Sequence, residues 1–215
     1  MLSDHFKRDD YWQSRIATMF LDPFYRSRGW HANRYPSDHP MQRLHVDVTL
    51  SREGRTPHHI DEKIIRGRRD GKRAEKVSLE TWSCSVPGRK VRGWIAADEA
   101  SKTTILHVCF ADTPDLAPDS WAKVRRLDCI WIPFRPLREW FAGQDENQWE
   151  LQDNEQSNHS LSRKVWIRQV FDAVPHCARF SVKAENEFYG ACRCGAPGLY
   201  VERGTWFCQD HYVRA

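Results

Sequence analysis

The sequence lacks the segments that would place a protein in or across a membrane. It contains no run of about 18 consecutive apolar residues, the length that a transmembrane helix needs. Residues 1–12, MLSDHFKRDDYW, hold no apolar stretch of the kind found in signal peptides. A G-x-G-x-x-G fingerprint and a P-loop are also absent, so no nucleotide cofactor is expected. These absences predict a cytoplasmic protein that acts without a membrane partner.

Charge, by contrast, is abundant and nearly balanced. The 215 residues include 33 Lys and Arg and 29 Asp and Glu, which gives a formal net charge of +4. This length suffices for one domain with a small appendage, and the ten Trp residues argue against wholesale disorder. The charges are unevenly distributed. Residues 64–76 are rich in Lys and Arg, whereas residues 142–162 contain acids and no Lys or Arg.

Hydrophobic periodicity predicts an α+β (α/β) domain with a mixed central sheet flanked by helices. Apolar residues recur at helical spacing over 9–21, and Pro23 is expected to end that helix. The stretch 22–41 is rich in Pro, Gly and Asp and is typical of a loop. Alternating or continuous apolar patterns predict a series of strands, at residues 43–50, 59–65, 76–82, 103–110 and 127–134. Short helical segments are expected at 119–126 and 137–141.

Composition divides the chain into three parts. Residues 1–141 carry the strand series and are expected to form the main domain. Residues 142–162 are acidic and polar and are typical of a solvated linker. Residues 163–215 are expected to form a C-terminal unit, with a helix over 163–173 followed by a cysteine-rich tail. Three cysteines outside the tail, Cys84, Cys109 and Cys129, are surrounded by apolar residues and are predicted to be core thiols in a reducing compartment.

Acidic residues and one lysine fall at informative positions on two of the expected strands. Asp61 and Lys63 point to one face of the strand 59–65, because side chains alternate along a strand. Asp47 lies on the polar face of the preceding expected strand. If the two strands pair, both carboxylates and the ammonium converge. Two carboxylates repel unless a cation joins them, and oxygen ligands favour Mg²⁺ or Mn²⁺. An isolated D-x-K triplet is also common as a solvated surface pair.

This arrangement resembles the PD-(D/E)XK nuclease superfamily, whose core is the restriction-endonuclease-like fold. The resemblance covers roughly residues 9–134, where QRLHVDV, IDEKI, SLETW and GWI follow the family's order, although Val46 replaces the motif's Pro. It implies that Asp47, Asp61 and the backbone carbonyl of Glu62 bind Mg²⁺ or Mn²⁺. It also implies that Lys63 assists attack on a phosphodiester, with Glu80 as an additional acid of the site.

A basic run follows the D-x-K strand directly. It comprises six side chains, Arg66, Arg68, Arg69, Lys72, Arg73 and Lys76. Contacts from Lys and Arg to phosphate dominate nucleic-acid affinity, so a run at this place suits DNA, with RNA as the alternative polyanion. A solvated hairpin tip is the competing interpretation. No base-reading motif accompanies the run, so it predicts no sequence specificity.

Clustered metal-ligand residues mark the C-terminal tail. Cys192-x-Cys194 is followed, after thirteen residues, by Cys208-x-x-His211. Three thiolates and one imidazole suit a closed tetrahedral Zn²⁺ site with a structural role. The pattern resembles zinc-ribbon and treble-clef modules, although a CxC pair is less typical of them than CxxC. The tail is therefore predicted to be a small unit that Zn²⁺ stabilises.

The sequence thus predicts a metal-dependent phosphodiesterase that acts on DNA. Two interpretations from other classes remain: a non-catalytic nucleic-acid- or protein-binding module on a degenerate nuclease fold, and a zinc-dependent interaction protein whose core merely supports the tail. Cleavage that depends on Mg²⁺ and on Lys63 separates the first prediction from the other two.

Overall fold

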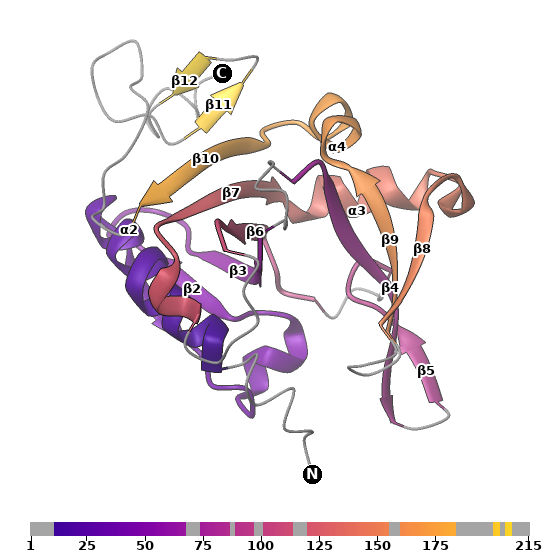
Figure 1. Cartoon of the computed structure of the whole chain (residues 1–215), viewed down its shortest axis with the longest axis horizontal. Helices are drawn as coiled ribbons and strands as arrows, with labels where there is room; N and C mark the ends of the chain where they lie inside the picture. The colour runs from indigo at the N-terminus through magenta and orange to yellow at the C-terminus, as the bar shows by residue number, and fades with distance from the viewer. Residues whose placement is uncertain are drawn as a thin grey trace.

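The computed structural model describes most of the chain. It covers residues 11–67, 74–86, 89–96, 101–113, 120–154, 160–183, 200–202 and 205–207. Within these ranges the protein has an α+β architecture with a mixed central sheet, as the sequence predicts (Figure 1). The sheet has six strands, and the expected strand 76–82 lies in a second sheet instead. None of the helices in these ranges is both long enough and apolar enough to cross a membrane.

The central sheet has the strand order β1-β2-β3-β6-β7-β10. Neighbouring strands run antiparallel except β3 and β6, which are parallel, with Asp61 opposite Leu106 and Lys63 opposite Val108. The strand bounds are β1 His31–Arg34, β2 Val48–Ser51, β3 His58–Ile65, β6 Ile105–Ala111, β7 Arg126–Pro133 and β10 Ala178–Lys183. β6 is buried along its whole length, as expected for a continuous apolar strand between two layers.

A second, antiparallel sheet packs against one face of the first. Its order is β5-β4-β9-β8, built from β4 Lys76–Val86, β5 Arg89–Arg92, β8 Glu150–Asn154 and β9 Ser160–Trp166. In Figure 1 this sheet stands beside the central one. A separate hairpin pairs β11 Tyr200–Glu202 with β12 Thr205–Phe207, within the predicted tail.

The N-terminal helices cover the opposite face of the central sheet. Residues 11–16 form an α-helix that continues through a π-helical turn, η1 Ala17–Leu21, into α2 Asp22–Ser27. Two further helices, α3 Phe134–Ala142 and α4 Ile167–Ala173, follow β7 and β9 and pack on the side of the second sheet. Three short 3₁₀ turns complete the described elements: η2 Pro40–Leu44, η3 Ser120–Lys123 and η4 Glu146–Gln148.

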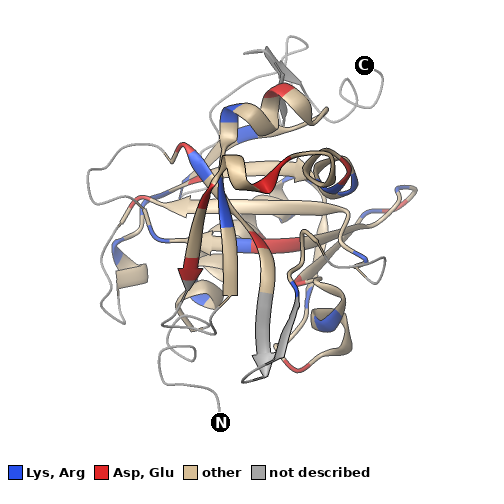
Figure 2. Ribbon diagram, turned by 90° about the vertical axis from the view of Figure 1, so that its right-hand side faces the viewer, with Lys and Arg blue, Asp and Glu red and all other residues tan. Residues whose placement is uncertain are grey.

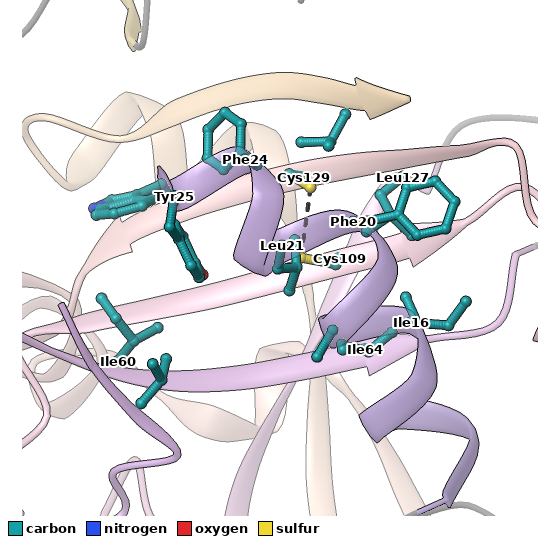
Figure 3. Packing of buried hydrophobic residues seen from close by; sticks show 14 of the residues in the cluster. Ile16, Phe20, Leu21, Phe24, Tyr25, Ile60, Ile64, Cys109, Leu127 and Cys129 are labelled. Carbon is teal, nitrogen blue, oxygen red and sulfur yellow. Dashed lines mark hydrogen bonds between the residues drawn. The ribbon is translucent and has the colours of Figure 1, made fainter. Parts of the chain in front are cut away.

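Two hydrophobic cores result, one on each face of the central sheet. The helix-side core joins residues of the N-terminal helices to β3, β6, β7 and β10 (Figure 3). The inter-sheet core joins the other face of β6 and β7 to β4, β9, α3 and α4. Because β3 lies between both cores, consecutive residues of this strand are buried in different layers.

The structure corrects several sequence-based expectations. Pro23 does not end the first helix: it occupies the first turn of α2, where its missing N–H is harmless. The expected loop 22–41 contains α2 and β1. The expected strand 43–50 begins only at Val48, because Pro40 initiates the turn η2 and His45 adopts a left-handed conformation with φ of 56°.

The C-terminal half also differs from expectation. The stretch 142–162, expected to be a linker, contains η4, β8 and the first residues of β9, and it is part of the second sheet. The helix expected over 163–173 begins at Ile167, because 163–166 complete β9. The helical segment at 137–141 is confirmed and extends over Phe134–Ala142, whereas that at 119–126 is the shorter turn η3.

Candidate active site

Two carboxylates meet where β2 and β3 pair. Asp47 immediately precedes β2, and its backbone N–H donates a hydrogen bond to the carbonyl of Ile60, 2.8 Å away. Two residues further along β3, the backbone N–H of Glu62 donates to Oδ2 of Asp47 at 2.7 Å. These two bonds hold the Asp47 carboxylate against β3. It faces Asp61, which is only 1% exposed.

The Asp47 carboxylate perturbs the ionisation of its neighbour. Burial raises the pKa of Asp61 to about 7; the ammonium of Lys63 opposes this rise and the Asp47 carboxylate adds to it. Oδ2 of Asp61 is buried without a hydrogen-bond donor among the described residues. A buried carboxyl oxygen without a donor, beside a second carboxylate, requires either a proton or a metal cation.

Lys63 completes the group on the same face of β3. Its Nζ lies 2.6 Å from Oδ1 of Asp61, and its side chain is 40% exposed. Burial alone would lower the pKa of Lys63, but the attraction of Asp61, Asp47 and Glu80 outweighs it and the pKa is raised. The lysine is therefore a cation in the folded protein and reaches solvent next to the carboxylate pair.

A pocket of about 260 Å³ opens between the two sheets next to this lysine. Lys63 lies at its wall together with side chains from β4, β9 and the helix 11–16; the polar lining residues are Gln13, Ser78, Glu80 and Ser162. Trp94 forms an apolar part of the wall and is buried. A molecule of moderate size that enters the pocket can therefore contact Lys63 and Glu80.

Glu62 points to the opposite face of the sheet and has a different environment. Its carboxylate accepts hydrogen bonds from Arg34 at 2.5 Å and from Tyr25 at 2.6 Å. Although burial alone would raise the pKa of Glu62, the Arg34 guanidinium outweighs it and the pKa lies below its ordinary value. Arg34 also bonds Asp22 at 2.7 Å. The buried Glu62 side chain thus belongs to a partly buried ion-pair network, and only its backbone faces the carboxylate pair.

The structure brings together the residues that the sequence singles out on β2, β3 and β4. Asp47, Asp61, Lys63 and Glu80 converge, in agreement with the expected face of β3. Figure 2 shows acidic and basic residues next to one another on strands near the middle of the molecule. Of the basic run, Arg66 and Lys76 lie in the described chain, whereas Arg68, Arg69, Lys72 and Arg73 lie outside it. The four predicted zinc ligands, Cys192, Cys194, Cys208 and His211, also lie outside the described residues.

Both described members of the basic run have protein partners. The guanidinium of Arg66 stacks over the ring of Trp12 at 4.8 Å. Lys76 bonds Glu150 at 3.0 Å and lies over Trp166, whose side chain is exposed. These contacts orient the two cations at the two ends of the basic run.

Two site neighbours escape the motif-based analysis. His45, which adopts the left-handed conformation two residues before Asp47, lies near Lys63. Burial lowers the pKa of His45, and the positive charge of Lys63 lowers it further. Gln13 reaches the pocket from the first helix. Alternation along the sequence places His45 on the same polar face as Asp47, and this pattern could have indicated that His45 lies at the site. Nothing in the local sequence of Gln13 indicates its place, because it depends on how the helix docks on the sheet.

Comparisons with known proteins give no further assignment. No protein-family model matches the chain, and neither the curated proteins nor the solved structures give a match. The functional argument therefore depends on the site itself.

Proposed function

We propose that this protein is a metal-dependent nuclease that hydrolyses phosphodiester bonds in DNA, with a core of the restriction-endonuclease-like PD-(D/E)XK type. One observation carries the proposal: the Asp47 carboxylate beside the buried Asp61, with the Lys63 ammonium 2.6 Å from Asp61. The mixed sheet with parallel β3 and β6, and helices on one face, supports the fold assignment.

The donor set fits a divalent cation. Asp61 offers a buried oxygen without a hydrogen-bond donor in the described chain, and Asp47 is fixed beside it by backbone hydrogen bonds. Oxygen ligands of this kind suit Mg²⁺ or Mn²⁺, and the backbone carbonyl of Glu62 is the third proposed ligand. When bound, the ion would act as a Lewis acid on the phosphate and lower the pKa of a coordinated water.

The protein's own groups would complete the chemistry. Lys63 presents a permanent positive charge at the pocket wall, where it can stabilise the charge that develops on a pentacovalent phosphate and orient the attacking water. Glu80 lies close enough to attract Lys63 and thus helps to keep its ammonium at the pocket. The short bond between Lys63 and Asp61 fixes the ammonium relative to the proposed metal ligands.

DNA is the proposed substrate because of the cations that follow β3 in the sequence. Arg66 and Lys76 flank the basic run, and both project from strands or strand ends that border the site. Contacts from such side chains to phosphates would position the backbone without reading its bases. The tail is proposed to bind a separate, structural Zn²⁺ through Cys192, Cys194, Cys208 and His211, in keeping with its described hairpin of β11 and β12.

A plasmid-nicking assay with purified full-length protein tests the proposal. We expect cleavage in Mg²⁺ or Mn²⁺, no cleavage without a divalent ion, and a loss of at least about a hundredfold in Lys63→Ala, since removing one preorganised charge from a reacting phosphate typically has this effect. Lys123→Ala, which removes an exposed cation from η3, is the matched control and should cleave normally.

Two outcomes bear on the competing interpretations. DNA binding without cleavage in either metal would favour the non-catalytic module on a degenerate nuclease fold. Cleavage that persists unchanged in Lys63→Ala and in Asp61→Asn would show that the chemistry resides elsewhere.

A further inference from the structure

A buried group of metal-ligating side chains lies in the helix-side core, away from the carboxylate pair. His107 and Cys109 occupy one face of β6, and Cys129 is the direct cross-strand neighbour of Cys109 on β7. All three are fully buried, with 0% exposure. The two sulfurs lie 3.5 Å apart, and one ligand atom from each residue falls within 4.8 Å of the others. Figure 3 shows the sulfurs facing each other beneath the N-terminal helices.

Hydrogen bonding fixes the form of the imidazole. The hydroxyl of Tyr25 lies 2.6 Å from Glu62 Oε1 and 2.7 Å from His107 Nδ1. Because Arg34 keeps Glu62 ionised, the hydroxyl must donate its only hydrogen to this carboxylate. His107 Nδ1 therefore carries a hydrogen and donates it to the Tyr25 oxygen. In the neutral ring, Nε2 is left with its lone pair.

No donor meets this lone pair at full hydrogen-bonding geometry in the described part of the protein, although it is completely buried, and the Cys109 thiol is a polar neighbour of the ring. A buried polar atom without a partner costs free energy, so such atoms are uncommon. Metal-ligating histidines characteristically donate their other ring N–H to a neighbouring acceptor, which sets the tautomer and orients the ring. The chain His107–Tyr25–Glu62–Arg34 has this form.

We propose that His107, Cys109 and Cys129 form a buried, structural site for a soft metal ion, Zn²⁺ or Cu⁺. Thiolate and imidazole ligands select these ions. Metal–sulfur bonds of about 2.3 Å and metal–nitrogen bonds of about 2.0 Å place such ligand atoms about 3.5–4 Å apart, in line with the observed spacing of the sulfurs. Binding of the ion would release the two thiol protons, and with Zn²⁺ the buried group would be electrically neutral.

The location assigns the site a role different from that of the pocket. It ties β6 to β7 within the helix-side core, whereas Asp61 and Lys63 face the other side of the sheet. Its three ligands are fully buried, so a substrate in solution cannot reach an ion held there. The inference does not depend on the proposed nuclease function, nor on the predicted zinc ligands in the tail.

Metal analysis of the full-length chain tests the site. The parent protein carries Cys192→Ser and Cys208→Ser, which removes thiols of the predicted tail site. After exposure to Zn²⁺, Cu⁺ or Co²⁺ under reducing conditions and desalting, we expect about one equivalent of metal per chain by mass spectrometry of the elements. The Co²⁺ form should show thiolate-to-metal charge-transfer absorption. Cys129→Ala in this parent should reduce retention at least tenfold, the usual effect of removing part of a site.

Cys177→Ala is the matched control, because Cys177 is another buried thiol outside the group. It should retain the full equivalent. Should the parent retain none of the three metals, or Cys129→Ala retain as much as Cys177→Ala, the proposal is wrong. X-ray absorption of the metal-loaded parent gives a readout that needs no core variant: two sulfurs and one nitrogen are expected, and a shell of oxygen and nitrogen alone would also overturn it.

Discussion

Adjacent acids on β3 have opposite energetic roles. Asp61 is buried against a second carboxylate and has a pKa of about 7, whereas Glu62 is buried against Arg34 and has a lowered pKa. The difference arises from the alternation of side chains along a strand that is covered on both faces. Without a metal, ionised Asp61 opposes folding, while ionised Glu62 is held by its hydrogen bonds.

The first prediction concerns Asp61 and pH. Its pKa rises from 3.8 in the unfolded chain to about 7 in the folded protein, so between these values the folded state binds more protons. Stability from this group is therefore present below about pH 4 and is lost as the pH rises to about 7, by about 4 kcal/mol in total. In Mg²⁺-free buffer, Asp61→Asn should be more stable than wild type at pH 8, and the difference should vanish towards pH 4.

Urea unfolding of both proteins between pH 4 and 8 measures this difference. Added Mg²⁺ should stabilise wild type, by about 2.7 kcal/mol at a hundredfold excess over the dissociation constant, and leave Asp61→Asn unchanged. A difference between the proteins that is flat across this pH range would contradict the assigned environment of Asp61.

The second prediction concerns Glu62. Glu62→Gln leaves the partly buried Arg34 guanidinium without its closest counter-charge, and breaking a pair with a buried partner in this way costs up to about 3–5 kcal/mol. Denaturant unfolding should show this loss at pH 7. Asp22→Asn removes the more exposed partner of Arg34 and should cost about 1 kcal/mol or less. Equal losses in the two variants would show that burial of Glu62 does not determine its contribution.

At the scale of elements, close backbone packing positions the pocket wall. A Cβ added at Gly93 would lie 2.3 Å from the carbonyl oxygen of Glu80 and 2.8 Å from the carbonyl carbon of Thr81. Since both contacts are with backbone atoms, a side chain at this position must displace β4. Gly93 is therefore a steric requirement for the placement of Glu80 beside Lys63.

The third prediction follows from that close approach. Gly93→Ala should destabilise the protein by about 3 kcal/mol, because overpacking of this kind forces the backbone to shift. It should also slow DNA nicking. At Gly54, with φ of 71° and open space around it, alanine meets only conformational strain and should cost about 1 kcal/mol without affecting nicking. A Gly93→Ala protein as stable as Gly54→Ala would refute the steric argument.

The success of sequence-based prediction also varies from element to element. β3, β6 and β7 follow the expected patterns because each carries a long run of apolar or alternating residues between buried layers. The segment before Val48 alternates equally well yet forms a turn, because Pro40 and the left-handed His45 determine the backbone there. β8 resembles a linker in composition because an edge strand can expose charged residues such as Glu150 and Asp153.

The residues of the candidate site also differ in how far the local sequence pattern predicts them. Asp61 and Lys63 share a face by strand periodicity alone, and Asp47 follows once β2 pairs with β3. The opposite burial of Glu62 depends on Arg34 and Tyr25, which come from β1 and α2 in a stretch expected to be loop. Long-range docking of this kind leaves no periodic trace in the sequence.

At the scale of the whole molecule, the basic run joins β3 of the central sheet to β4 of the second sheet. The fourth prediction is that Arg68, Arg69 and Arg73 bind phosphates of DNA. Changing all three to Gln should weaken DNA binding at about 50 mM salt and reduce the slope of log K against log salt concentration by about 0.9 for each phosphate that is no longer neutralised. Fluorescence anisotropy over a salt series measures this slope.

A matched triple variant at Arg52, Arg55 and Arg125 is the control and should leave the slope nearly unchanged. If both triple variants reduced the slope equally, binding would depend only on net charge.

The alternation of Asp61, Glu62 and Lys63 between two buried layers also restricts how the sheet can assemble. If β3 paired with β6 one residue out of register, Asp61 and Lys63 would enter the apolar helix side, and Glu62 would face the second sheet far from Arg34. Every such misalignment buries unpaired charges, at several kcal/mol each. The polar residues proposed to bind metal and substrate therefore also oppose any misalignment of this parallel strand pair by an odd number of residues.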